Sequence, residues 1–414
     1  MVDVAVIGRG MIGSAAARHL AEAGLTVAAI GPDEPTDWTT WTGPFASHFD
    51  EGRITRISDR SPVWSDLAKR SIERYPDIEA RSGLAIHHPV GLAISTPDLD
   101  TWLDTSKANG APVERVDPQW LADTTGITLE DDVPVAYEAA PAGHINPRRL
   151  VEAQNLLARQ AGASIVAEAA TSIGRSSVRP ASGSSPGFTV GGPWGTIEAA
   201  RVVVATGSFG HGLLDPDIER QLGLVRRPRT VLLAELGPDP DDRRHLPSLI
   251  MRDQTDDRLA SIYWVPPVRY PNGRSYLKIG GVLATDIEIG TGSDPHAELV
   301  AWFAGSGDPV EVDALHKTLE LRLPDRPILS TAAVPCVYTG TDNGRPFIDQ
   351  VDDGLVVALG GNGAAAKSSD EIGRLAAALA AAGLANGGQS TDDETPDETL
   401  GHLPDPALFG LAAG

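Results

Sequence analysis

VDVAVIGRGMIG, residues 2–13, joins a short apolar run to three glycines. Residues 2–7 predict a buried strand, and residues 11–23 predict a helix that ends at Gly24. Residues 26–30 predict a second buried strand. The three elements form a β-α-β unit, which indicates a parallel sheet.

The spacing of the three glycines is typical of a dinucleotide-binding turn. Gly8 permits the tight turn, Gly10 lets the backbone approach a pyrophosphate, and Gly13 lets the helix pack closely on the strand. The helix start, at Met11 and Ile12, offers free N–H groups and a positive dipole end to the phosphates. These five residues are predicted to bind a dinucleotide cofactor, although a glycine-rich turn without a ligand would have the same pattern.

The end of the second strand departs from the dinucleotide-binding pattern. An Asp or Glu is expected there to hydrogen-bond the adenosine ribose, but Gly31 holds that position. Asp33 or Glu34 could reach back to do this, or water or the backbone could hold the ribose. We take Asp33 as the candidate.

Composition excludes several classes of protein. The 414 residues carry a formal net charge of −22 and include one cysteine, Cys336. A strongly acidic surface repels nucleic acid and anionic lipid, and a single cysteine forms no internal disulfide. The sequence has no signal-peptide pattern, no apolar run of 18 residues and no zinc-site spacing. We expect a cytoplasmic protein without a metal, a monomer or homodimer.

The rest of the chain predicts two kinds of structure. Helices start at Ser61-Pro62 and Asn146-Pro147, whereas β-rich runs after residue 230 predict an antiparallel sheet. Residues 355–359 return to a buried strand, followed by glycines and a helix over 369–382 that Ser368 and Glu371 would cap as a capping box. The tail after residue 383 is expected to add little to the core.

The predicted fold class is α/β, or α+β overall. A Rossmann-like domain with a mainly parallel sheet would bind FAD, and a substrate domain would have a mixed or antiparallel sheet with flanking helices. The predicted boundaries are 1–85, 145–225 and 330–383 for the FAD-binding domain, 86–144 and 226–329 for the substrate domain, and 384–414 for an acidic tail.

Five segments together resemble the D-amino acid oxidase superfamily of FAD-dependent oxidoreductases, in particular its monomeric sarcosine oxidase-like branch. They are the glycine motif, SHFDEGRITR (residues 47–56), AGHINPR (142–148), ATG (205–207) and CVYT (336–339). The resemblance covers residues 2 to about 383. It implies FAD as the cofactor, with Ser47, His48 and Gly207 among the residues that bind it.

The resemblance also implies roles for individual residues. Cys336 matches a cysteine that carries FAD as a thioether, and Lys278 matches a lysine that activates dioxygen. Arg53 matches an arginine near the flavin ring, and Tyr338 matches a tyrosine of the substrate pocket. Lys367 is the candidate for a lysine that contacts flavin and substrate carboxylate, although ungapped counting puts Ala365 there. The family's histidine near the lysine is replaced by Val282.

Each of these residues also has an ordinary structural interpretation. Lysines mostly face solvent, a lone cysteine is usually a small buried hydrophobe, and Gly361, Asn362 and Gly363 could form a simple turn rather than contact flavin. Arg53 could be one of two surface arginines. Tyr263 and Trp264 could either pack around an alkylammonium or belong to the core.

The predicted activity is that of an FAD-dependent oxidase of a secondary amine or N-methyl amino acid. The resemblance implies hydride transfer from the carbon of the C–N bond to flavin N5, hydrolysis of the imine, and reoxidation by O₂ to give H₂O₂. The alternatives are a flavin dehydrogenase that passes electrons to a carrier, a flavin-binding protein without turnover, and an NAD-dependent dehydrogenase.

Overall fold

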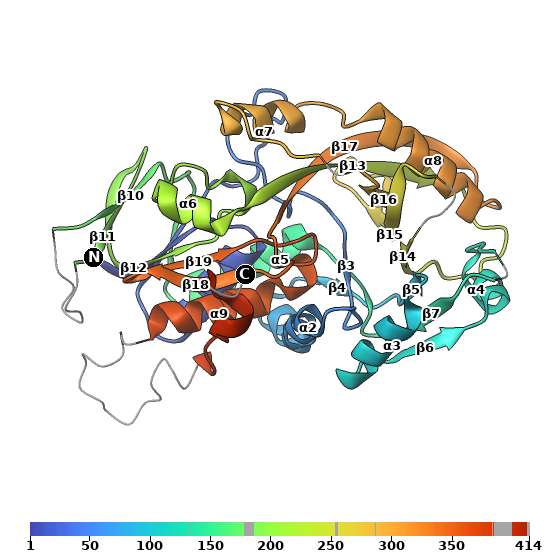
Figure 1. The fold of residues 1–414 in the computed structure, drawn as a ribbon, viewed down its shortest axis with the longest axis horizontal. Coiled ribbons are helices and arrows are strands. Elements are labelled where there is room, and N and C mark those ends of the chain that lie inside the picture. Colours follow the sequence, from blue (N-terminus) through green and yellow to red (C-terminus); the bar gives the residue numbers. More distant parts are fainter. Residues whose placement is uncertain are drawn as a thin grey trace.

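The computed structural model describes residues 1–130, 132–177, 186–252, 256–285, 287–382, 384 and 400–411. Its strands lie in two large sheets and one small one, and the chain crosses between them several times (Figure 1). The helices are α1 (Met11–Glu22), α2 (Pro62–Ser82), α3 (Leu99–Ala108), α4 (Pro118–Thr125), α5 (Pro147–Gln160), α6 (Pro216–Leu222), α7 (Pro295–Phe303), α8 (Pro309–Arg322), α9 (Ser369–Ala381) and α11 (Pro406–Phe409), with the 3-10 turns η1 (Gly207–Phe209) and η2 (Ala366–Ser368).

The first sheet has a parallel centre, in the order β9-β2-β1-β12-β19. Antiparallel strands extend it beyond β12, on the side away from β1. There β11 pairs with the first half of β12 and β10 with β11, while β18 pairs with β19. Its strands are β1 (Val2–Ile7), β2 (Val27–Ile30), β9 (Ser164–Val166), β10 (Ser172–Arg175), β11 (Phe188–Gly192), β12 (Gly195–Val204), β18 (Phe347–Asp352) and β19 (Leu355–Leu359).

Strand β1 is apolar on both faces because both faces of the first sheet are covered. Val4 and Val6 join the core cluster that contains α1 and α9, whereas Ala5 and Ile7 join a second cluster on the opposite face. The predicted βαβ unit and the α/β fold class are confirmed.

The second sheet carries the β-rich runs of the middle of the chain, in the order β17-β13-β16-β15-β14-β5-β7-β6. Only the β14–β5 pair in this order is parallel, so the predicted mixed or antiparallel sheet is confirmed. Its strands are β5 (Leu92–Ser95), β6 (Val113–Val116), β7 (Val135–Glu138), β13 (Val225–Leu236), β14 (Ser248–Met251), β15 (Leu259–Arg269), β16 (Ser275–Leu283) and β17 (Ile328–Gly340); the small sheet consists of β3 (Arg53–Thr55), β8 (Gly143–Ile145) and β4 (His87–His88).

Strand β17 contains residue 330, where a domain boundary was predicted. It pairs with β13 over nearly its whole length, from Gly340 opposite Val225 to Ile328 opposite Leu236. The two long strands run side by side from the first sheet into the second (Figure 1). The expected boundary at residue 330 therefore falls within a strand of the second sheet, so that Cys336 belongs to that sheet.

The starts of three helices were predicted from local sequence, and two of the predictions are confirmed. The Ser61 side chain accepts a bond from the N–H of Trp64, and Asn146 accepts one from Arg149. The capping box at α9 is wrong, because Ser368 makes no capping bond. The Glu371 carboxylate instead binds Arg74 and Arg374, since a charged partner outcompetes a backbone N–H.

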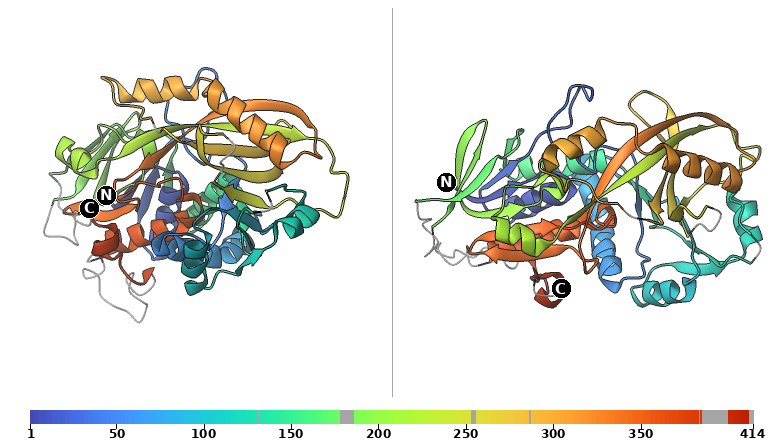
Figure 2. Two further views of the ribbon diagram at one scale, coloured as in Figure 1. Left: turned by 45° about the vertical axis from the view of Figure 1, so that its right-hand side comes forward. Right: turned by 45° about the horizontal axis from the view of Figure 1, so that its top comes forward.

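The C-terminal segment packs on the core more closely than its composition predicted. Leu400 and Phe409 are both buried in the cluster around α1 and α9. The Leu411 N–H also donates to Asp349 at 2.9 Å. Figure 2 shows this dark red segment beside α9. The expectation that residues beyond 383 add little to the core is wrong for 400–411; most of 383–399 lies outside the described residues.

Candidate active site

A long cavity of about 480 Å³ starts where β1, β2, β12 and β19 end and continues to the second sheet. The carboxyl edge of a parallel sheet is where open α/β folds bind ligands. Of the predicted site residues, those that line the cavity are Gly8, Gly10, Met11, Ile12, Ser47, His48, Arg53, Gly207, Cys336, Tyr338, Gly361, Asn362, Gly363 and Lys367. Gly13, Asp33 and Lys278 do not line it.

The glycine turn at one end of the cavity has no room for side chains. A Cβ on Gly8 would lie 2.3 Å from the Ala205 carbonyl oxygen, and a Cβ on Gly13 would lie 1.7 Å from the Gly8 oxygen. Gly8 also has φ of +100°, a conformation that favours glycine. Backbone N–H groups at the start of α1 can therefore closely approach an anion.

His48 lies over this turn, and its Nδ1 has no hydrogen-bond partner among the described residues. Burial and the nearby arginines, first Arg148, lower the pKa of His48 to about 3. A neutral, buried imidazole beside a helix N-terminus has hydrogen-bonding capacity left for a ligand. The turn, the helix start and His48 together fit a pyrophosphate.

The ribose prediction for Asp33 is not supported by its position. Its side chain is 68% exposed and pairs with Arg9 at 3.0 Å. Gly31 lines the cavity instead, and a Cβ there would lie 2.9 Å from the backbone nitrogen of Arg9. An acidic residue at position 31 would therefore clash with the glycine turn. Arg9 donates to the Gly31 carbonyl oxygen at 2.8 Å.

The other end of the cavity brings together three residues that the sequence singled out. Arg53 lies on β3, Lys278 on β16 and Cys336 on β17. The Arg53 Nη2 atom is 3.9 Å from the Cys336 sulfur, which is half-buried. Lys278 is fully buried, so the solvent-facing interpretation is wrong. Its neighbours Leu277 and Ile279 point into the core of the second sheet, as strand alternation requires.

Asp50 is the residue that joins this cluster, and sequence reasoning gave it no role. Its Oδ2 atom lies 2.6 Å from Lys278 Nζ and also contacts Arg53, while its Oδ1 atom accepts from the Tyr270 hydroxyl at 2.8 Å. Burial lowers the pKa of Lys278, with Arg53 adding to that effect. The adjacent Asp50 carboxylate favours the ammonium form. Its position within the quoted segment SHFDEGR was the available signal.

Lys367 lines the cavity but is fully buried, and its ammonium is already engaged. Its Nζ atom lies 3.2 Å from an Asp59 carboxylate oxygen and donates to the Trp64 carbonyl oxygen at 3.1 Å. Burial lowers the pKa of Lys367 to about 8. Arg56, which also lines the cavity, binds the same Asp59 oxygen at 3.0 Å.

The aromatic residues of the second sheet divide between the cavity and the core. Tyr263 lines the cavity, whereas Trp264 is fully buried in the core and donates to the Pro247 carbonyl. Tyr338 lines the cavity next to Arg229, whose guanidinium stacks 4.7 Å from its ring centroid. Arg229 is a further residue that sequence reasoning missed, because only the pairing of β13 with β17 places it opposite Cys336.

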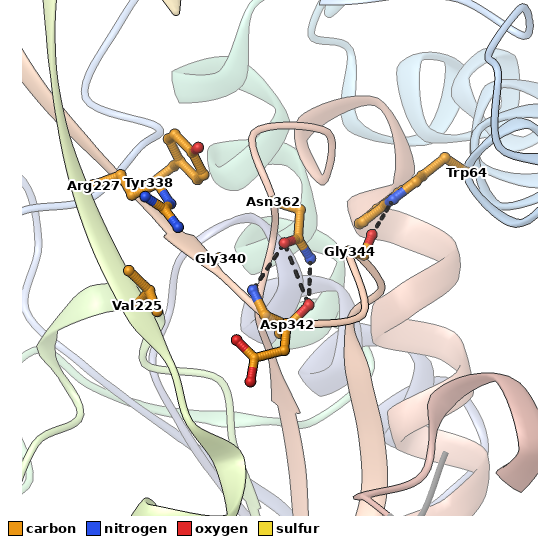
Figure 3. A pocket seen from close by; sticks show the side chains of 9 residues that line it. Trp64, Val225, Arg227, Tyr338, Gly340, Asp342, Gly344 and Asn362 are labelled. Atoms are coloured by element: carbon orange, nitrogen blue, oxygen red, sulfur yellow. Dashed lines mark hydrogen bonds between the residues drawn. The ribbon is translucent and has the colours of Figure 1, made fainter. Parts of the chain in front are cut away.

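A polar vestibule adjoins the cavity and shares Tyr338 and Asn362 with it. Figure 3 shows it enclosed by Tyr338 and Arg227 on one side and Trp64 on the other. Asn362 is fixed there because its Oδ1 atom accepts from the Thr341 N–H at 2.9 Å. The Gly361–Gly363 turn is therefore part of the site rather than an isolated surface turn.

The βαβ unit, the glycine turn and the cavity that runs from it to the second sheet define a dinucleotide-binding fold. Comparison with known proteins identifies the class more closely: the family profile described as DAO, FAD dependent oxidoreductase, matches residues 3–379. The chain belongs to this family, which confirms the expected resemblance and FAD as the cofactor. The glycine cradle, His48 and the extended cavity fit FAD.

Individual relatives agree in fold. The chain is 25% identical over 399 residues to monomeric sarcosine oxidase from Streptomyces avermitilis, covering 92% of this chain and 94% of that protein. The open form of NikD, an amino acid oxidase of nikkomycin biosynthesis, superposes with a TM-score of 0.71 at 18% identity over 97% of both chains. L-Proline dehydrogenase from P. horikoshii superposes with a TM-score of 0.66 at 17% identity, covering 91% of this chain and 92% of that one.

Proposed function

We propose that this chain is an FAD-dependent oxidase of a secondary amine or N-methyl amino acid. The observation that carries the proposal is the grouping of three residues from distant strands: Arg53 and Cys336 line one end of the cavity, and Lys278 lies behind them, linked to Arg53 through Asp50. The similarity to a monomeric sarcosine oxidase supports the same chemistry. The overall reaction converts amine, O₂ and water to a carbonyl compound, the shortened amine and H₂O₂.

FAD, when bound, supplies the two-electron acceptor between the amine and O₂. The chain's own residues orient the substrate and fix charge. Ile54, Ile250 and Val282 form an apolar wall, and Tyr263 adds an aromatic ring that favours an alkylammonium or alkylamine. The Lys278 ammonium, held by Asp50 at 2.6 Å, stabilises negative charge that develops on reduced oxygen.

Cys336 is the proposed attachment point for the cofactor. Its sulfur lies at the cavity wall, 3.9 Å from Arg53, on a strand whose partner β13 contributes Arg229 to the same wall. A purified yellow protein should keep its colour after acid precipitation, and Cys336→Ser should release the colour to the supernatant. Colour that is released equally by both proteins would contradict attachment.

The test of the oxidase assignment separates the two halves of the reaction. Lys278→Met should slow reoxidation of the reduced protein by O₂ about 100-fold or more, because one well-placed charge contributes that order of stabilisation, and should slow anaerobic bleaching by amine much less. Lys317→Met, at an exposed lysine paired with Asp313, is the matched control and should change neither rate.

The outcomes also distinguish the alternatives. If the reduced wild-type protein forms no peroxide in air but passes electrons to an artificial carrier, the chain is a dehydrogenase. If no amine bleaches the bound flavin, the amine assignment fails. Equal losses in bleaching and reoxidation in Lys278→Met would contradict the role assigned to that lysine.

A further inference from the structure

Two of the cations that line the cavity converge on a single carboxylate. Arg56 Nη2 and Lys367 Nζ lie 3.0 and 3.2 Å from the same oxygen of Asp59. Although burial opposes ionisation, Lys367 and Arg56 lower the pKa of Asp59. The Asp59 side chain is 12% exposed, so this is an internal ion cluster rather than a surface pair.

Asp59 is held in place from its other side. Its Oδ1 atom accepts from the Ser61 N–H at 3.0 Å, at the start of α2. The preceding residues are fixed as well, because the buried Glu138 carboxylate accepts from the N–H groups of Ile57 and Ser58. Asp59 therefore cannot swing away from Arg56 and Lys367 without breaking this partly buried hydrogen bond and leaving both cations without their counter-ion.

This arrangement lowers the anion-binding capacity that Arg56 and Lys367 would otherwise give the cavity, because Asp59 balances one of their two positive charges. A carboxylate entering the cavity would meet two cations whose charge is shared with a fixed carboxylate, and like charges at one site repel. Two further cations of the cavity have carboxylate partners, Arg53 with Asp50 and Arg9 with Asp33. Arg229, which also lines the cavity, donates to the Tyr338 hydroxyl and to the Pro228 carbonyl oxygen. Ile54, Ile250 and Val282, which also line the cavity, offer no charge.

We propose that Asp59 is a built-in counter-ion that sets substrate specificity, and that the preferred substrate is an amine without a carboxylate group. This inference rests on the proposed amine oxidation and selects the secondary amine over the N-methyl amino acid. Asp59 does not line the cavity itself; it acts through Arg56 and Lys367, and is therefore a specificity-determining rather than a catalytic residue.

The direct test measures anion binding in the flavin-containing protein without turnover. Acetate and its neutral analogue acetamide are titrated by calorimetry and by the perturbation of flavin absorbance. The wild-type protein should bind acetate no more tightly than acetamide. Asp59→Asn keeps the hydrogen bond from Ser61 and frees both cations, so the ratio of acetate to acetamide affinity should rise about tenfold or more.

Asp66→Asn is the matched control, because Asp66 forms an exposed pair with Arg70 on the next turn of α2. It removes one negative charge outside the cavity and should leave the affinity ratio unchanged. Tighter binding of acetate than acetamide by the wild-type protein, or an unchanged ratio in a folded, yellow Asp59→Asn protein, would overturn the proposal.

A second measurement needs no variant and separates this inference from the proposed function. Anaerobic bleaching is compared for sarcosine and N-methylglycinamide, which differ only in replacement of the carboxylate by an amide. Faster bleaching by the amide supports the role of Asp59. Faster bleaching by sarcosine overturns it while leaving amine oxidation intact, and failure of every amine tested rejects the proposed function itself.

Discussion

His144 is a buried imidazole outside the cavity whose environment disfavours a charge. Its ring stacks on His88 with centroids 4.8 Å apart, and its Nδ1 atom has no hydrogen-bond partner among the described residues. Burial and then the neighbouring His88, His87 and Lys278 lower the pKa of His144 to about 3. This residue is thus a structural imidazole that folding keeps neutral.

The lowered pKa predicts an acid-sensitive contribution to stability. Below pH 6.5 the unfolded chain takes up a proton at His144 and the folded chain does not, so stability is lost as the pH falls from 6.5 towards 3. The loss should reach roughly 2–3 kcal/mol at pH 4.5. His144→Phe should remove this part of the pH dependence of the free energy of unfolding, measured by urea denaturation.

The control for this prediction is His316→Phe, at an exposed position on α8 beside Glu320. It should leave the difference in stability between pH 7 and pH 4.5 unchanged. An unaltered pH profile in His144→Phe, with the variant otherwise folded, would show that His144 is already charged in the native protein.

At the scale of elements, the close crossing of α1 and α9 joins the two ends of the chain in one core. The closest approach is at Gly373, where a Cβ would lie 2.6 Å from the Ala15 Cβ and 2.7 Å from the Ile12 carbonyl oxygen. Ile12 also lines the cavity. The position of α1, and with it the glycine turn, therefore depends on a small residue in α9.

Gly373→Ala should destabilise the protein despite the better helix propensity of alanine. The propensity gain is about 1 kcal/mol, whereas overpacking typically costs about 1–3 kcal/mol, and here the clash includes backbone atoms. A lower urea midpoint and weaker retention of flavin are expected. Gly174→Ala, on β10 with nothing within 4 Å of the added Cβ, is the control and should be nearly neutral.

The elements themselves were predictable to different degrees. The βαβ unit, β19 and the helices after Ser61 and Asn146 follow local rules of periodicity and capping, and the structure confirms them. The capping box at α9 failed because Glu371 binds Arg74, which is distant in the sequence, and Arg374 on the same helix. The boundary expected at residue 330 lies inside β17, because strand pairing, which links distant segments, decides which sheet contains that strand.

At the scale of the whole molecule, the C-terminal segment closes the core of the first sheet. Leu400 and Phe409 are buried, and Arg374 on α9 donates to the Leu400 carbonyl. Figure 2 shows this segment and the N-terminal β-α-β unit in the same half of the molecule. No helix among the described residues is long and apolar enough to cross a membrane.

Deletion of residues 400–414 should lower the free energy of unfolding by about 3–6 kcal/mol, because two large buried apolar side chains are lost. Leu400→Ala should account for about half of this effect. Leu403→Ala, at a residue that is 51% exposed in the same segment, should have little effect. Equal effects of the two alanine variants on the urea midpoint would contradict the packing role of Leu400.

Local sequence was enough to predict the class of fold and the glycine turn, because strand and helix periodicity and turn chemistry are local properties. The family resemblance singled out Arg53, Lys278, Cys336 and Lys367. Which carboxylates pair with these side chains is a property of the tertiary structure. Pairing of distant segments puts Asp50 on Lys278 and Asp59 on Lys367, and a buried charge is defined by the partners that replace its water.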